Sequence, residues 1–129
     1  MIEKLSAVQL KGILEAIPID ISFVDENDKV RFWNKHEGRI FKRPLSVLGQ
    51  DVQKCHPQHS LEKVNEVIAD LKNGKRDFAE FWIDLKGRKA HIRYFAVRDE
   101  SGRYLGTLEA AQDITEIKKI EGEKRLLNY

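Results

Sequence analysis

The chain is poor in cysteine, proline and methionine, with 1, 3 and 1 of them in 129 residues. The single cysteine, Cys55, cannot form an internal disulfide, so we expect a reducing compartment and predict a cytoplasmic location. No apolar run is long enough to cross a membrane, and residues 1–5 lack the apolar stretch of a secretory signal. We therefore expect no membrane association.

An excess of one charge is also missing, because 23 Lys and Arg face 21 Asp and Glu for a net charge of +2. The two signs are interleaved, so no basic stripe exists that could follow phosphates, and we expect no nucleic-acid binding. The chain has no Gly-rich phosphate loop, no Gly-x-Ser-x-Gly and no His-Glu-x-x-His. We predict that the protein is not an enzyme.

What the chain does have is a change of hydrophobic period. Residues 2–17 show helical spacing, weakened by Gly12 and ended by Pro18. The apolar face of this segment must be buried on the domain's own sheet or on a second subunit. From Ile19 the period changes to two over Ile19–Phe23 and Lys29–Trp33, which predicts two strands. Three further strands are predicted at Phe78–Leu85, Lys89–Val97 and Tyr104–Ala111, with the turn residues Lys86-Gly87 and Ser101-Gly102 between them.

Helices are expected between the second and third strands and after the last. Asn34 is placed to begin a short helix over Lys35–Phe41, and Ser60 to cap a longer helix that Asn73-Gly74 ends. A charged helix is expected from Thr115. This order predicts an α+β fold with one antiparallel sheet and helices on one face, so that the space between them is the natural cavity. We expect a flanking helix over residues 1–17, a domain over 18–114 and an exit helix over 115–129.

Five motifs in this order resemble those of PAS domains. They are Phe32-Trp33-Asn34, Val47-Leu48-Gly49-Gln50-Asp51-Val52, His56-Pro57, the hairpin Ala96–Gly106 and Gln112-Asp113-Ile114-Thr115-Glu116. The resemblance implies a PAS fold with a five-stranded antiparallel sheet and a sensory or regulatory role. It also implies that the signal leaves through Asp113, Ile114 and Thr115, where the aspartate pairs with a basic side chain.

A closer resemblance is to the C-terminal PAS domain of prokaryotic proteins that join a domain of unknown function to a hemerythrin-like helical domain. It rests on Glu80–Ile83, Ile92–Asp99 and Glu121–Leu127. The hemerythrin-like part is absent from this chain, which is then either a free-standing relative or an excised domain.

An apolar pocket between sheet and helices is the favoured ligand site. Its predicted ligand-binding residues are Trp33, Phe41, His56, His59, Ile68, Phe81, Ile92, Tyr94 and Leu108. The alternative is that the apolar members simply fill the core of a small domain. The chain would then be a ligand-free interaction module in which the terminal helices hold a homodimer.

Cofactor binding is a third alternative, centred on Cys55, His56 and His59. A structural zinc needs about four ligands, and the remaining histidines lie in other elements, so we predict no metal site. Haem needs a single axial histidine and stays open, although in haem-binding PAS domains that histidine falls near Lys63 of this chain. Flavin is less favoured, because Val52 stands where the light-sensing relatives carry cysteine. Non-covalent flavin would need Trp33 or Trp82 against the ring.

Overall fold

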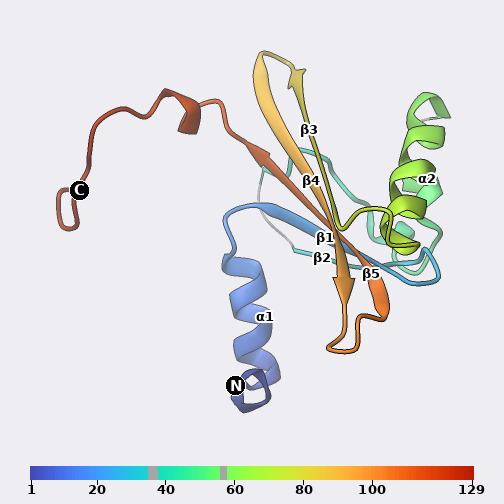
Figure 1. The fold of residues 1–129 in the computed structure, drawn as a ribbon. Helices are drawn as coiled ribbons and strands as arrows, with labels where there is room; N and C mark the ends of the chain where they lie inside the picture. The colour runs from blue at the N-terminus through green and yellow to red at the C-terminus, as the bar shows by residue number, and fades with distance from the viewer. Residues whose placement is uncertain (35–37, 56–57) are drawn as a thin grey trace.

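The computed structural model of the protein is a five-stranded antiparallel sheet with two α-helices (Figure 1). The structure describes residues 1–34, 38–55 and 58–129, without the side chains of residues 54, 55, 58 and 59. The strands lie in the order β2-β1-β5-β4-β3. The elements are α1 (Ala7–Ala16), β1 (Asp20–Asp25), β2 (Val30–Trp33), α2 (Gln58–Lys72), β3 (Phe78–Leu85), β4 (Arg88–Arg98) and β5 (Tyr104–Asp113). The predicted α+β class and the five predicted strands are confirmed.

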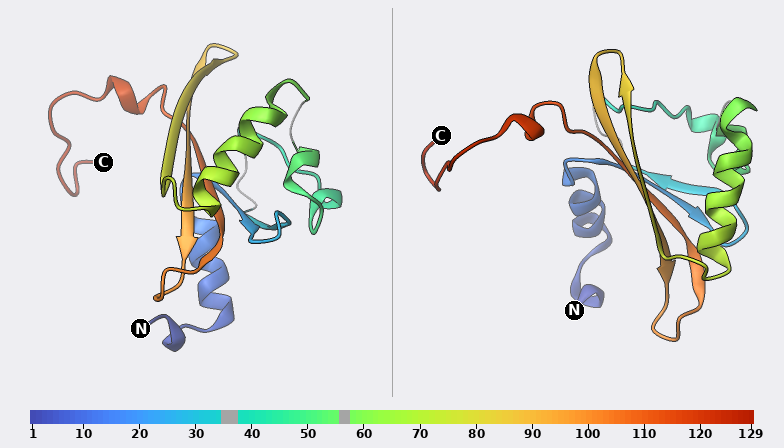
Figure 2. Two further views of the ribbon diagram at one scale, coloured as in Figure 1. Left: turned by 45° about the vertical axis from the view of Figure 1, so that its right-hand side comes forward. Right: turned by 45° about the horizontal axis from the view of Figure 1, so that its top comes forward.

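One face of the sheet is covered by α2 and by the segment 38–55 that precedes it (Figure 2). We call this the covered face and the opposite one the outer face. The register sets Ser22 beside Glu109 and Glu109 beside Tyr94, so all three share one face. Their side chains belong to the covered face because they line a cavity together with residues of α2. The compact core under α2 consists of Val24, Val30, Val52 and Ile68, with Trp33 and Val64 packed against it.

The segment after β2 is organised by the buried side chain of Asn34. Its Oδ1 accepts from the Ile21 backbone N–H at 3.0 Å, and its Nδ2 donates to the Ile19 carbonyl at 2.8 Å. Asn34 therefore ties the start of β1 to the end of β2. The expected helix Lys35–Phe41 lies partly outside the described residues, and residues 38–41 are not helical. Gly38, with φ of +72°, is in the left-handed region, which interrupts a right-handed helix.

The long helix α2 begins at Gln58, two residues before the expected cap. Ser60 therefore lies inside the first turn. The helix ends as predicted, because Lys72 is followed by Asn73 and by Gly74 at φ +82°. Among the described residues, no helix is long and apolar enough to span a membrane.

The two terminal segments differ from their predictions in different ways. Helix α1 forms, with a capping box between Ser6 and Gln9, but Val8 remains 82% exposed. The predicted exit helix over 115–129 is wrong, because this segment holds a single 3₁₀ turn at Ile117–Lys119 and otherwise extends away from the sheet (Figure 1). A short helix with no packed face is marginal in water, and Gly122 with φ of +66° interrupts it further.

Candidate ligand-binding groove and exit latch

An apolar groove of about 280 Å³ lies between residues 60–67 of α2 and the strands β3 and β4. Its lining residues are Ser60, Lys63, Val64, Val67, Phe81, Ile83, Ile92 and Tyr94. The rings of Phe81 and Tyr94 meet edge to face, with centroids 6.0 Å apart. The volume lies close to the lower end of the range of small-molecule sites, about 300–1,000 Å³, and the lining is of the usual apolar kind.

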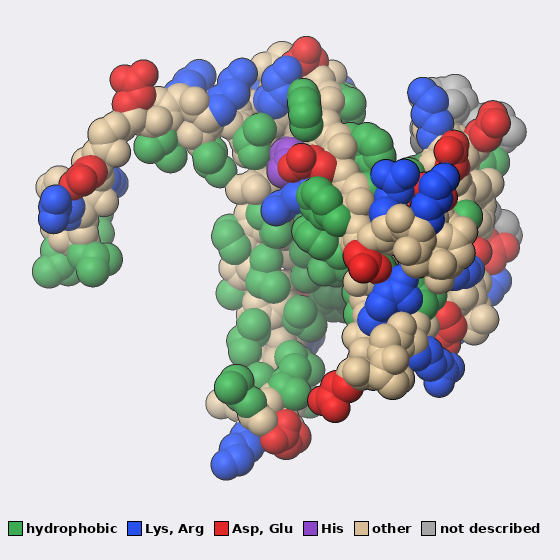
Figure 3. All heavy atoms as spheres, in the orientation of Figure 1, with side chains coloured by type: hydrophobic (Ala, Val, Ile, Leu, Met, Phe, Trp, Pro, Cys, Tyr) green, Lys and Arg blue, Asp and Glu red, His purple; other side chains and the backbone are tan. Residues whose placement is uncertain are grey.

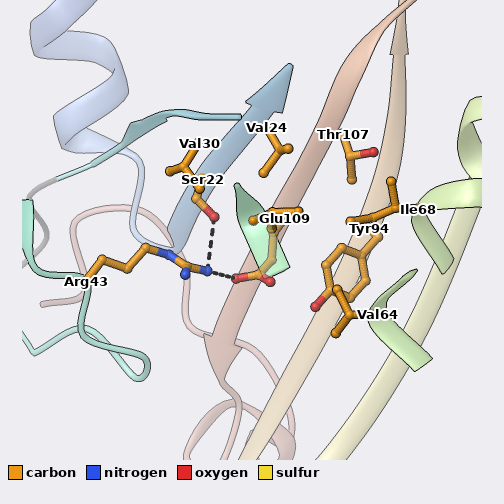
Figure 4. A pocket seen from close by; sticks show the side chains of 10 residues that line it. Ser22, Val24, Val30, Arg43, Val64, Ile68, Tyr94, Thr107 and Glu109 are labelled. Atoms are coloured by element: carbon orange, nitrogen blue, oxygen red, sulfur yellow. Dashed lines mark hydrogen bonds and ion pairs between the residues drawn. The ribbon is translucent and has the colours of Figure 1, made fainter. Parts of the chain in front are cut away.

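A second, smaller cavity of about 20 Å³ lies deeper under α2 (Figure 4). Tyr94 and Val64 line both spaces, so their side chains form the wall between the groove and the cavity. The smaller cavity has room for about one water molecule. The predicted pocket is therefore divided into an open apolar part and a small, nearly closed part.

The small cavity is bordered by a buried ion pair. Arg43 Nη2 donates to Glu109 Oε1 at 2.8 Å, and the two side chains are only 9% and 11% exposed. The same Nη2 lies 3.4 Å from the hydroxyl of Ser22. Burial, with a further contribution from the charge of Glu109 and its hydrogen bond, raises the pKa of Tyr94, so its hydroxyl keeps its proton. The segment 38–55, β1, β4 and β5 each contribute one member of this cluster, namely Arg43, Ser22, Tyr94 and Glu109.

At the far end of β5, Asp113 is held by three donors. Arg88 Nε donates to its Oδ2 at 2.8 Å, while the backbone N–H and the hydroxyl of Thr115 donate to its Oδ1 at 3.0 and 2.6 Å. The donors from Thr115 and then Arg88 lower the pKa of Asp113 to about 2. The Lys89 backbone N–H also donates to the Thr115 hydroxyl, at 2.8 Å. We call Arg88, Asp113 and Thr115 the exit latch, because together they fix where the chain leaves the sheet.

The family profile described as "PAS domain" matches residues 10–115, which is most of the chain. The chain belongs to the PAS family. Searched against curated proteins, it has no significant match. The crystal structure of a C-terminal domain from Streptococcus mutans is similar, with 35% identity, a TM-score of 0.85 and 91% of each chain covered.

Two more distant relatives share the fold of this PAS domain. The PAS domain of BvgS from Bordetella pertussis has 18% identity and a TM-score of 0.65, covering 85% of this chain and 87% of that one. A sensory box histidine kinase structure from Vibrio cholerae has 13% identity and a TM-score of 0.60, covering 84% and 90%. None of these three relatives is described as carrying a hemerythrin-like part, so that closer kinship stays a prediction.

The PAS domain brings together three of the predicted ligand-binding residues, since Phe81, Ile92 and Tyr94 all line the groove. Trp33 and Ile68 pack into the core beside the small cavity. Phe41 lies elsewhere, in a cleft of about 360 Å³ next to Arg88 and Asp113. Fewer residues therefore line the groove than the sequence predicts.

The placement of Leu108 in the pocket is wrong. Leu108 pairs with Phe23 and Phe95 on the outer face, because it is one residue away from Glu109 and successive strand residues point to opposite sides. Trp82 lies on the outer face for the same reason and is 63% exposed, so it cannot stack on a ligand in the groove.

The predicted cofactor ligands cannot be placed, because His56 and the side chains of Cys55 and His59 lie outside the described residues. In the part of the chain that the structure describes, no group of three or more His, Cys, Asp and Glu could hold a metal ion. Lys63, near which the resemblance would put the histidine of a haem-binding PAS domain, lines the groove.

Sequence reasoning missed the Arg43–Glu109 pair, although one signal was present. Glu109 stands between Thr107 and Ala111 in the alternation of β5, at a position that faces the core. A carboxylate at such a position requires a partner, because an unpaired buried charge is costly. The partner could not be read from the sequence, since Arg43 is 66 residues away in an irregular segment.

Proposed function

We propose that this PAS domain is a sensory or regulatory module that binds a small apolar ligand in the groove and transmits the event through β5 to the chain after Thr115. The observation that carries the proposal is the position of Tyr94. Its ring forms a wall of the groove, and its hydroxyl interacts with Glu109, which lies on the same strand as Asp113. Strand β4 adds a second route, because it carries Tyr94, Lys89 and Arg88.

A ligand can shift the exit latch only if it binds two arrangements of the domain with different affinity. In the groove it would contact residues 60–67 of α2 on one side and β3 and β4 on the other. Filling this space favours the arrangement in which helix and strands are closely spaced. Strand β4 carries Arg88, which donates to Asp113, and Lys89, whose backbone N–H donates to the Thr115 hydroxyl. A shift of β4 therefore moves hydrogen-bond partners of the exit latch directly.

Native mass spectrometry of protein purified from its own host tests this proposal. The unmodified domain should carry an added small-molecule mass. The variant Val67→Trp, which fills the groove, should lose that mass, while the matched control Ala69→Trp should keep it because Ala69 is exposed on the same helix. Bare protein in all three samples, or equal retention by both variants, contradicts ligand binding in the groove.

A second candidate function is a ligand-free homodimer, supported by exposed apolar side chains on α1 and on the outer face. Val8 of α1 is 82% exposed, Ile13 49%, and Phe78 of β3 44%. Figure 3 shows hydrophobic side chains gathered along α1 and over the strands beside it. A second copy of the chain is the expected occupant, now through α1 alone, since residues 115–129 form no continuous helix.

Light scattering after size-exclusion chromatography distinguishes the two candidates. The homodimer predicts a mass of two chains that Ile13→Asp reduces to one, because Ile13 lies on the apolar side of α1, with Lys11→Ser as a control on the opposite side. A single-chain mass at high concentration contradicts it. The haem or iron alternative stays a prediction, because it depends on side chains that the structure does not describe. Absence of a Soret band after haem addition would exclude the haem form.

A further inference from the structure

The cleft beside the exit latch is larger than the groove and has a different chemical character. Its volume is about 360 Å³, which lies within the range of small-molecule sites. The segment 38–55 contributes Ile40 and Phe41 to its lining, and the β3–β4 hairpin contributes Leu85 and Ala90. The cleft therefore has apolar surface on which the body of a small molecule can lie.

The polar members of the lining are two cations and one carboxylate, namely Lys86, Arg88 and Asp113. Arg88 neutralises Asp113 through the 2.8 Å contact of the exit latch. Lys86 forms no ion pair within the part of the chain that the structure describes, and the nearby Asp84 is already paired with Lys89 at 2.5 Å. The described lining thus carries one uncompensated positive charge, which favours a ligand with a single negative charge.

Arg88 keeps donors that the latch does not use. Its Nε donates to Asp113, its Nη1 lies 3.5 Å from Glu116 Oε1, and its Nη2 has no acceptor among the described residues. The contact with Glu116 is long, and the Glu116 side chain is 70% exposed, so it contributes little and an anion can replace it. Two guanidinium N–H groups side by side match the two oxygens of a carboxylate.

The hairpin turn beside the cleft places a lysine where lysine is uncommon. Lys86 has φ of +52° and Gly87 has φ of +78°, as in a two-residue turn whose first central position favours Asn, Asp or Gly. A lysine backbone is less favourable than glycine in this left-handed region. A use for the Lys86 ammonium group at the cleft is a reason to keep lysine at this position.

We propose that this cleft is a second ligand site, which binds a small organic anion with one carboxylate on a compact apolar body. The carboxylate binds the Lys86 ammonium group and the Nη atoms of Arg88, and the body lies on the apolar lining. Because Arg88 Nε also holds Asp113, the bound anion acts on the exit latch without passing through the groove. The two sites are separate, since no described residue lines both.

Three probes of nearly equal shape test the proposal: benzoate, benzamide and benzamidinium. They share a phenyl ring and carry a carboxylate, a neutral amide or a cationic amidinium. NMR of the unmodified protein follows the methyl signals of Ile40 and Leu85, the Arg88 Nε–H and the Thr115 N–H. We expect benzoate to bind at least about tenfold tighter than benzamide, because hydrogen bonds between charged groups contribute that much. Benzamidinium should not bind, and only benzoate should shift the Arg88 and Thr115 signals.

The variant Lys86→Met and its matched control Lys63→Met each remove one exposed lysine, the first from the cleft and the second from the groove. Lys86→Met should weaken benzoate about threefold to fivefold, the contribution of one exposed ion pair. Lys63→Met should leave the affinity for benzoate unchanged. Both lysines are exposed, so both variants should fold.

The outcomes separate this inference from the proposed function. Equal affinities for benzoate and benzamide, or equal weakening by the two variants, overturn it because the cleft then does not recognise a carboxylate. Benzoate that shifts the methyl signals of Val64 and Val67 in place of those in the cleft binds the groove, which overturns this inference and leaves the proposed function standing. Benzoate bound in the cleft without any shift at Arg88 and Thr115 contradicts an action on the latch.

Discussion

The part of α2 up to Val67 and the part from Ile68 to Lys72 cover the same face of the sheet in different ways. From Ile68 onward, Leu71 is fully buried and Ile68 is 6% exposed, and Ile68 packs against Val24, Val30 and Val52. Before Ile68, Val64 and Val67 are partly exposed beside an open groove. Each pair of apolar residues has the same spacing of three. Because sheets twist, a straight helix follows one closely over only part of its length. Residues 68–72 thus anchor the helix, while residues 60–67 leave space that a ligand can use.

The largest expected effect on stability comes from shortening one apolar side chain in each of these two parts of α2. Leu71→Ala should lower the free energy of unfolding by about 3–5 kcal/mol, because it leaves a cavity in a closed core. Val67→Ala should lower it by less than about 1.5 kcal/mol, because its side chain already borders open space. Urea unfolding followed by circular dichroism measures both. Equal losses of unfolding free energy would show that Val67 is packed as tightly as Leu71.

Breaking the buried ion pair of Arg43 and Glu109 is expected to have the next largest effect on stability. Glu109→Gln should destabilise the domain by about 3 kcal/mol, because Arg43 is left without a counter-charge. The double variant Arg43→Met with Glu109→Gln should recover most of that loss, since no unpaired charge remains. Additive losses in this cycle would mean that the pair is not coupled.

Acid should weaken the exit latch only when the pH falls well below 3.8. The pKa of Asp113 is lowered from 3.8 to about 2, so its stabilising contribution is fully present above pH 3.8 and is lost as the pH falls through 2. Carboxyl-carbon NMR of Asp113 should therefore show a midpoint near pH 2. A midpoint near 3.8 would mean that the latch is open in solution.

The smallest effect is expected from removing one donor of the latch. Arg88→Ala should raise the pKa of Asp113 only part of the way back to 3.8, because the Thr115 donors contribute more and remain. Thr115→Val should raise it further. The same NMR titration measures both variants, and the reverse order would make Arg88 the dominant partner.

Much of this fold follows from local sequence patterns. Period-two alternation predicts β1 and β2, turn residues separate β3, β4 and β5, and Gly74 marks the end of α2. The same rule, applied to β5, places Leu108 and Glu109 on opposite faces, but only the register of β4 with β5 shows that Glu109 lies beside Tyr94. Local patterns are sufficient where backbone geometry is set by neighbours in sequence.

The rest depends on contacts between distant segments. The partner of Asp113 is Arg88, which becomes evident only once Ala90 is paired with Asp113 across β4 and β5. The groove depends on how far α2 stands from the sheet, which no spacing of apolar residues encodes. The exit helix predicted over residues 115–129 is absent for a related reason. A short segment with helical propensity is not stable as a helix when no face of it packs against the domain.

The central claim is that filling the groove changes the exit latch. Amide hydrogen exchange at Ile114 and Thr115, measured by NMR in the unmodified protein, Val67→Trp and Ala69→Trp, tests it most directly. The account predicts that Val67→Trp, whose added ring fills the groove, changes exchange at both amides several-fold, while Ala69→Trp leaves them unchanged. Identical exchange in all three folded proteins would show that the groove and the latch are not connected.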